Sequence, residues 1–365
     1  MHEIVKYGII GCGMMGQEHI RNIALLDGAE VVAFLEPDPG MARHTRALVP
    51  DAVQYGSIAE LLAHDPLDAL VIASPNFLHV PEMMEIAQRR ALPLLIEKPL
   101  YTSEDQAAAL TAIDYPAPVW VAMEYRYMPP IAALIDKATG ATGAPRMLSI
   151  REHRFPFLDK VGDWNRFNAF TGGTFVEKCC HFFDLMRLIL QSEPVRIMAS
   201  AGQELNHKDE VYGDRVPDIL DSGYVLVDFE SGARAMLELC MFAEGGRWQE
   251  EIALTGHAGK VEAFVPGPTR FWPEALGPSP TAQLVVSPRH PKGPETLELP
   301  VDPRLLEAGD HNGATFYQHQ RFREVVLGRA EVEVTLADGA RAVEMGLAAQ
   351  KSAATGEAVH LPPQS

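Results

Sequence analysis

The feature that most constrains this chain is a glycine-rich turn between an apolar strand and a helix near the amino terminus. An apolar segment, Ile4 to Ile10, leads into the turn, and residues 17–26 are compatible with a helix. Here the first glycine permits a tight turn, the second lets the backbone approach a pyrophosphate, and the third allows close helix packing. The pattern predicts a dinucleotide site at the helix amino end. Its residues are Gly11, Cys12, Gly13, Met14, Met15 and Gly16.

A second apolar strand, Val31 to Leu35, ends at Glu36, twenty residues after Gly16. An acid at this place can bond both ribose hydroxyls of an adenosine half, and it would repel the 2′-phosphate of NADP. We therefore expect NAD as the cofactor, with NADP disfavoured. The alternative, a glycine turn without a dinucleotide, does not explain the acid.

Strand and helix patterns then alternate to residue 123, which predicts a doubly wound parallel sheet. A short buried strand, Leu94 to Ile96, is followed by Glu97, Lys98 and Pro99, so Lys98 should face the ligand crevice at a carboxyl end. The plain alternative is a surface lysine. Four residues after the strand 69–73 could lie under a nicotinamide ribose, although Asn76 and His79 could also serve as turn and helix-cap residues. They are Ser74, Pro75, Asn76 and His79.

After residue 124 the pattern changes to long strands with few helices, which indicates an α+β domain with a mainly antiparallel sheet. We expect a Rossmann domain over residues 1–123 and a substrate-binding and oligomerisation domain over 124–365. Ten prolines between Pro266 and Pro303 predict loops around one or two short edge strands there.

A second polar stretch follows Gly172 and Gly173, where we expect one helix running to about Leu190. Glu177 and His181 are four residues apart, so one helical face would carry both and the carboxylate could orient the imidazole. A satisfied core histidine is the alternative. A metal site is less favoured, because no third ligand lies nearby in the sequence.

Composition restricts the partners. Forty-nine acidic against thirty-one basic residues give a net charge of -18, which opposes binding to nucleic acid or anionic membranes. The amino terminus lacks a secretory signal and no apolar run is long enough to span a bilayer. The four cysteines form no CxxC pair. We expect a cytoplasmic protein with reduced thiols.

Taken together, the glycine turn, Glu36, residues 74–79, Glu97-Lys98-Pro99, Tyr125-Arg126, the glycine pair and the Glu177 to His181 spacing resemble the Gfo/Idh/MocA family, which includes glucose-fructose oxidoreductase and inositol dehydrogenases. The resemblance implies a Rossmann domain followed by an α/β domain whose open sheet often mediates homodimers or homotetramers. Similar members oxidise a secondary hydroxyl of a sugar or cyclitol. Their lysine and histidine correspond to Lys98 and His181, and their aspartate corresponds to Glu177. Lys178, Cys179 and Cys180 depart from the common pattern.

In this reading Lys98, with a pKa lowered by desolvation, is the base, and His181 shares or relays the proton. Glu97 and Arg126 are further cofactor residues. A transiently oxidising hydrolase or lyase, a non-catalytic ligand sensor and a biliverdin-reductase-like enzyme are the alternatives. The expected polyol or sugar contacts are Lys98, Tyr125, Arg154, Asp163, Trp164, Asn165, His181, His311 and Tyr317.

Overall fold

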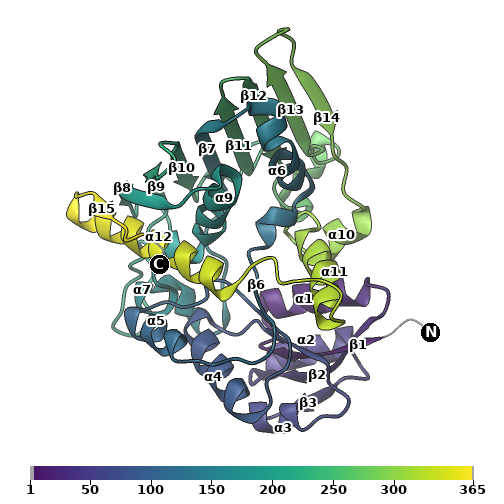
Figure 1. The fold of residues 1–365 in the computed structure, drawn as a ribbon. Coiled ribbons are helices and arrows are strands. Elements are labelled where there is room, and N and C mark those ends of the chain that lie inside the picture. The colour runs from purple at the N-terminus through teal and green to yellow at the C-terminus, as the bar shows by residue number, and fades with distance from the viewer. Residues whose placement is uncertain (1–3, 364–365) are drawn as a thin grey trace.

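The first sheet is parallel, with the strand order β3-β2-β1-β4-β5-β6. The computed structural model describes residues 4–363, and this sheet forms the lower body in Figure 1. The strand order reverses between β1 and β4, and ligands bind beside the carboxyl ends at such a point. The strands are β1 (Val5–Ile10), β2 (Ala29–Leu35), β3 (Val53–Tyr55), β4 (Ala69–Ile72), β5 (Leu94–Ile96) and β6 (Val119–Val121).

Helices cover both faces of this sheet, so its central strands are buried. Every residue of β4 and β5 is buried, which explains why these strands read as continuous apolar runs. The helices are α1 (Met14–Ala24), α2 (Pro39–Leu48), α3 (Ile58–Leu62), η1 (Asn76–Leu78), α4 (His79–Arg89) and α5 (Glu104–Thr111).

The second sheet has the order β14-β13-β12-β11-β7-β10-β9-β8-β15. Strands β7 and β10 pair in parallel, and the other neighbours pair antiparallel. The strands are β7 (Pro145–His153), β8 (Pro194–Gly202), β9 (Ser222–Phe229), β10 (Arg234–Cys240), β11 (Glu250–Gly256), β12 (Gly259–Val265), β13 (Gln283–Pro288), β14 (Glu295–Glu298) and β15 (Val359–His360).

One face of the second sheet packs against helices and the other is open. Helices α6, α9 and α12 contact the sheet, and along β9 and β10 buried residues alternate with more exposed ones. Met147, Tyr224 and Leu226 are large apolar side chains exposed on the open face. The helices of this half are η2 (Glu124–Tyr127), α6 (Pro129–Thr142), η3 (Val161–Arg166), α7 (Asn168–Thr171), α8 (Thr174–Glu177), α9 (Cys180–Leu190), η4 (Thr269–Phe271), η5 (Glu274–Leu276), α10 (Pro303–Ala308), α11 (Ala314–Val326) and α12 (Leu336–Thr355).

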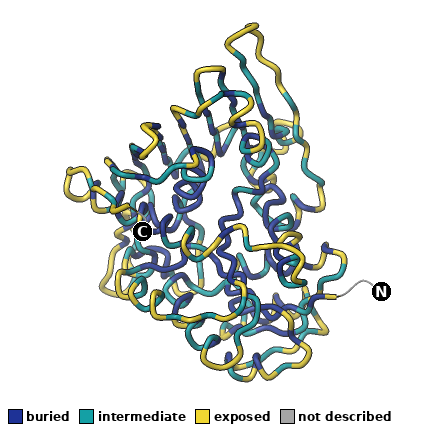
Figure 2. Tube along the Cα trace, in the orientation of Figure 1, coloured by how far each residue is buried: buried dark blue, intermediate teal, exposed yellow. Residues whose placement is uncertain are grey.

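The last third of the chain ties the two halves together. Helices α10 and α11 contact α1, and Val121 of β6 donates a backbone hydrogen bond to Val334, 3.0 Å away. Figure 2 shows the buried segments of both halves continuing into one another around these contacts. The first sheet is therefore held by residues from both ends of the sequence.

The predicted fold class is confirmed, although several elements differ from the prediction, which also lacked β3 and β15. Strand β12 is missing from the prediction, although it follows β11 after a short turn and alternates buried and half-buried residues. The helix expected from Gly173 to Leu190 is two helices, α8 and α9. The boundary at residue 123 stays a prediction.

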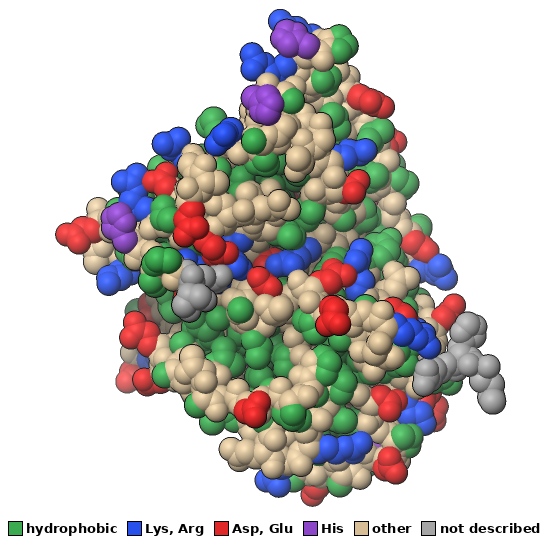
Figure 3. Space-filling model, in the orientation of Figure 1, with side chains coloured by type: hydrophobic (Ala, Val, Ile, Leu, Met, Phe, Trp, Pro, Cys, Tyr) green, Lys and Arg blue, Asp and Glu red, His purple; other side chains and the backbone are tan. Residues whose placement is uncertain are grey.

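Within residues 4–363, no helix has the length and apolar content needed to cross a membrane. Acidic and basic side chains are interspersed over the face drawn in Figure 3.

Candidate active site

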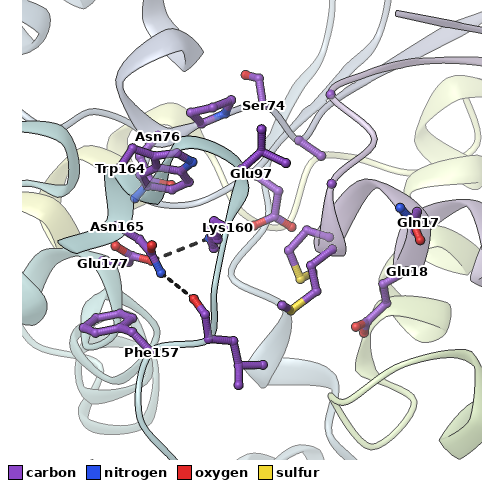
Figure 4. Close-up of a pocket in the computed structure, with 18 of the residues that line it drawn as sticks. Gln17, Glu18, Ser74, Asn76, Glu97, Phe157, Lys160, Trp164, Asn165 and Glu177 are labelled. Atoms are coloured by element: carbon purple, nitrogen blue, oxygen red, sulfur yellow. Dashed lines mark hydrogen bonds and ion pairs between the residues drawn. The ribbon is translucent and has the colours of Figure 1, made fainter. Parts of the chain in front are cut away.

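A cavity of about 550 Å³ lies where the carboxyl ends of the first sheet meet the loop before η3 and the α8–α9 turn of the second half. The glycine turn and Glu36 line one part of it. Lys98, Glu177 and the loop from Arg154 to Asn165 line the other part (Figure 4). One cavity therefore joins the predicted cofactor residues to the predicted substrate residues.

The glycine turn fits a dinucleotide. Gly11 has a φ of +82°, and a Cβ there would lie 2.5 Å from the backbone nitrogen of Ser74. A Cβ at Gly16 would lie 2.1 Å from the carbonyl oxygen of Gly11, so α1 packs directly under the turn. A Cβ on Gly13 meets no atom within 4 Å, which leaves its backbone open for a ligand. Helix α1 has no acid in its first turn, so its amino end can receive the pyrophosphate of NAD.

Glu36 directly follows β2 and lines the same cavity. Its two carboxylate oxygens each accept a 2.7 Å hydrogen bond, one from the backbone nitrogen of Cys12 and one from that of Asp38. These bonds fix the carboxylate beside the glycine turn. The position suits an acid that bonds ribose hydroxyls and repels a 2′-phosphate.

Lys98 stands at the carboxyl end of β5, as predicted, and its neighbour Glu97 holds it there. Glu97 accepts a 3.1 Å hydrogen bond from the Lys98 backbone nitrogen, and its other oxygen lies 2.9 Å from His19 Nε2. Burial alone would raise the pKa of Glu97, but His19 outweighs burial and the pKa is lowered. An ionised Glu97 therefore lies beside Lys98.

The predicted lowering of the Lys98 pKa is wrong. Burial acts in that direction, but Cys180, Glu97 and Glu177 together outweigh it, and the pKa of Lys98 is raised. Lys98 is accordingly an ammonium group in this structure, and a proton donor rather than a ready base.

Glu177 lies at the end of α8 and faces the cavity, but it does not orient His181. Its Oε1 lies 3.7 Å from Lys160 Nζ, and its buried Oε2 has no hydrogen-bond partner among the described residues (Figure 4). The expected bond to His181 fails because the chain turns at Lys178 and Cys179, so Glu177 and His181 belong to different helices. The Glu177 carbonyl oxygen accepts a 3.2 Å hydrogen bond from Lys98 Nζ.

His181 lies behind Tyr125 and does not itself line the cavity. The two rings stack with centroids 3.9 Å apart and an angle of 5° between their planes. Burial, followed by the charge of Lys98, holds the pKa of His181 well below its usual value, so the imidazole is neutral. Nδ1 is buried and has no partner within residues 4–363.

Glu18, Glu124 and His311 form a buried charged cluster that joins α1 to the start of α11. His311 Nδ1 lies 2.7 Å from Glu18 and 3.5 Å from Glu124, and the hydroxyl of Thr315 bonds both carboxylates. Burial lowers the pKa of His311, but Glu124 and Glu18 outweigh it and raise the pKa to about 10. Their ligand atoms lie within 4.8 Å of one another, close enough to hold a metal ion. An imidazolium between two carboxylates accounts for the cluster without a metal.

Most predicted site residues meet in the cavity. Those that line it are Gly11, Gly13, Met14, Met15, Glu36, Ser74, Pro75, Asn76, His79, Glu97, Lys98, Tyr125, Arg154, Trp164, Asn165, Glu177 and His311. Gly16 packs beneath the turn instead.

Three further predicted residues lie away from the cavity lining. Arg126 donates to Asp184 at 2.6 Å and to the carbonyl oxygen of Glu333 at 3.0 Å, so it joins α9 to the segment before α12. Asp163 lies in the η3 turn with a φ of 51°. Tyr317 packs against Phe316 and the start of α11. Each was assigned from its place near a loop or helix start, which does not determine the direction of a side chain.

The sequence reasoning missed many lining residues, and four of them matter for the chemistry of the site: Glu18, Phe157, Lys160 and Lys178. Lys178 had been noted only as a departure from the family pattern. No local motif marks Lys160, because its partner Glu177 is distant in sequence. Glu18 follows the glycine turn closely, and that position was the one available signal.

Two family models match the chain. The model of the oxidoreductase family's NAD-binding Rossmann fold matches residues 5–123, and that of the same family's C-terminal alpha/beta domain matches residues 138–361. The rhizopine catabolism protein MocA of Rhizobium meliloti is 28% identical over 273 residues, which are 73% of this chain and 79% of that protein. An inositol 2-dehydrogenase of Arthrobacter is 26% identical over 251 residues, 67% of this chain and 70% of its own.

Solved structures share the whole fold. The myo-inositol dehydrogenase of Corynebacterium glutamicum superposes with a TM-score of 0.75 at 22% identity, covering 99% of this chain and 100% of its own. An oxidoreductase from Agrobacterium radiobacter, solved in complex with NAD+, L-tartaric acid and magnesium, gives 0.76 at 20% identity, covering 98% of each chain.

Proposed function

Because the chain belongs to the Gfo/Idh/MocA oxidoreductase family and carries its NAD-binding domain, we propose that it moves a hydride between NAD and a secondary hydroxyl or ketone of a sugar, glycoside or cyclitol. The observation that carries this proposal is the position of Lys98. A rigid strand end presents its ammonium to a cavity that also contains the glycine turn and Glu36. Polar side chains that could contact a polyol, among them Asn165 and His311, line the rest of that cavity.

NAD, when bound, supplies the hydride acceptor at C4 of its nicotinamide. The glycine turn and the amino end of α1 would hold its pyrophosphate, and Glu36 its adenosine ribose. The turn 74–79 is fastened for this purpose, because the ring nitrogens of His79 lie 2.8 Å from the carbonyl oxygen of Pro99 and 3.1 Å from that of Ser74. The same histidine thus supports the loop that carries Lys98.

Lys98 would act on the substrate oxygen. As an ammonium it donates a hydrogen bond to that oxygen, which stabilises the negative charge that develops there during oxidation. In the direction of ketone reduction it is placed to give up the proton. The Glu177 carbonyl oxygen accepts a hydrogen bond from the ammonium, and Glu97 accepts one from the Lys98 backbone nitrogen.

The hydroxyl proton needs a neutral or anionic acceptor. The unpartnered Oε2 of Glu177 is buried and belongs to a residue that lines the cavity, so we assign Glu177 this role or that of a hydrogen-bond acceptor for the polyol. His181 is then a positioning residue, because it supports the ring of Tyr125 from behind. Lys160 holds Glu177 in place.

The open face of the second sheet supports a homodimer or homotetramer. Leu226 and Met198 are paired neighbours in the sheet and are exposed by 48% and 37%. Exposed apolar side chains on a sheet face are typical of an interface between subunits. Leu226→Glu should lower the molar mass measured by light scattering after gel filtration, and an unchanged mass would count against this interface.

The direct test of function is a screen of NAD reduction across cyclitols, aldoses, glycosides and deoxy sugars. The proposal requires at least one polyol to give NADH and the corresponding ketone. If no polyol is oxidised and no ketone is reduced by NADH, the assignment to this chemistry fails.

A further inference from the structure

The substrate end of the cavity contains an unusual number of cations. Three lysines and one arginine line it, from four different places in the chain. They are Lys98, Arg154, Lys160 and Lys178. Like charges gathered in a cavity repel one another unless anions compensate them.

Three of these four cations already have a partner. Lys160 pairs with Glu177, and Arg154 Nη1 lies 2.8 Å from Glu152. Lys98 donates to the Glu177 carbonyl oxygen and lies beside the ionised Glu97. Glu177 and Glu152 are thus engaged with Lys160 and Arg154, each through one carboxylate oxygen.

Lys178 is the exception. Within the described chain its ammonium forms no hydrogen bond or ion pair, and its one close polar contact is with the ring of Phe157, 5.2 Å from the centroid. Arg154 lines the same cavity, and its Nε is buried without a partner among the described residues. Burial, then the charges of Arg154 and Lys98, hold the pKa of Lys178 well below its usual value. An anion between the two side chains would remove this repulsion.

Glu250, another buried carboxyl of the second sheet, does not supply that anion. Glu250 faces Glu152 across β11 and β7. Burial, then Glu152, raises the pKa of Glu250 to about 8, so it is mostly protonated at neutral pH.

We propose that Lys178, with Arg154 near it, binds a carboxylate carried by the substrate, so that the preferred substrate is a sugar acid. A bound carboxylate would raise the pKa of Lys178 again, so the side chain is expected to take up a proton as the anion binds. This inference rests on the proposed function, since it names the substrate class of the same site. It also explains why a lysine stands at a position where the family pattern differs.

The experiment compares each acid with its neutral parent. Calorimetry on the NADH-loaded enzyme measures binding of D-glucuronate against D-glucose, D-galacturonate against D-galactose, and D-mannuronate against D-mannose. NADH prevents oxidation of these ligands, so binding is measured without turnover. Wild type should bind at least one acid roughly 10- to 100-fold more tightly than its parent, the range of a charge-assisted hydrogen bond.

Variants then locate the effect. Lys178→Met should reduce the ratio of the acid's affinity to its parent's affinity to within about threefold of one, whereas Lys178→Arg should retain most of the wild-type ratio. Lys351→Met, which removes an exposed lysine of α12, is the matched control and should retain all of it. NAD affinity should stay the same in Lys178→Met.

Several results would overturn the inference. The inference fails if no acid binds better than its neutral parent, or if the preference for the acid survives in Lys178→Met. It also fails if Lys178→Met lowers the affinity for NAD together with the preference for the acid. Glucose 6-phosphate that binds better than every uronate would assign the site to phosphate instead. An enzyme that oxidises neutral polyols without preference keeps its proposed function while this inference fails. Uronate binding that depends on Lys178, without any NAD-linked turnover, would support this inference while the proposed function fails.

Discussion

The ammonium nitrogen of Lys98 lies 3.2 Å from the backbone carbonyl oxygen of Glu177, and this contact ties the end of β5 to the end of α8. The contact exists because the chain turns at Lys178 and Cys179, after α8 ends and before α9 begins. It brings the lysine of the first domain and the carboxylate of the second into one cavity. The proposed chemistry depends on this junction between the domains.

Lys98→Met should lower turnover roughly 10²- to 10⁴-fold, because the side chain keeps its length but loses the charge and the proton. NAD binding, followed by protein fluorescence, should stay within a few-fold of wild type. Lys351→Met serves as the control for loss of a lysine elsewhere. A comparable loss of NAD affinity in Lys98→Met would make Lys98 a cofactor residue instead.

Gly13→Ala should weaken NAD binding by at least tenfold while leaving the melting temperature of the free enzyme unchanged. The new methyl group meets no protein atom within 4 Å, but it occupies the space that the pyrophosphate needs. Gly140→Ala in α6 is the matched control, because its Cβ also meets nothing within 4 Å. Equal NAD affinity in the two variants would contradict the cofactor site.

The sequence was sufficient for the part of the site that local geometry determines. The glycine turn, Glu36 and Lys98 directly follow strands. In a parallel sheet the carboxyl ends of the strands open onto the ligand crevice, so residues at these ends face the ligand. The second domain was harder, because Glu177 and His181 depend on whether residues 174–190 form one helix or two. Helical periodicity does not reveal a two-residue interruption.

Contacts between residues far apart in the sequence could not be predicted from it either. Arg126 was assigned to the cofactor, yet it bonds Asp184 on α9. The sign of the Lys98 pKa shift depended on Cys180 and Glu177 as well as on the adjacent Glu97, and no local pattern encodes the approach of the first two. Polar residues on loops were recognised as candidates, but their directions required the tertiary structure.

Preference for NAD over NADP should follow from Glu36. Glu36→Ser removes the negative charge, and kcat/KM for NADP relative to NAD should then rise at least tenfold. Part of the total activity should also be lost, because the carboxylate fixes the backbone of Cys12 and Asp38. A wild-type enzyme that uses NADP as efficiently as NAD would show that Glu36 does not select the cofactor.

Because of His311, the folded protein should lose stability as the pH becomes alkaline. Its folded pKa of about 10 exceeds the unfolded value near 6.5, so its stabilising contribution is fully present below pH 6.5 and is lost as the pH rises through about 10. The difference in melting temperature between wild type and His311→Gln should therefore shrink from pH 6.5 to pH 10. His360→Gln, at an exposed histidine, should give no such trend. A difference that stays constant with pH would mean that the His311 cluster is uncharged.

The central claim is net oxidation of a secondary hydroxyl with NAD as the acceptor. The measurement is the amount of NADH formed per mole of substrate consumed, with the organic product identified by mass spectrometry and NMR. The account predicts one NADH and one ketone for each sugar, glycoside or cyclitol molecule consumed. Consumption of a glycoside with release of free sugar and no accumulation of NADH would contradict it and would identify a hydrolase or lyase that oxidises its substrate only transiently.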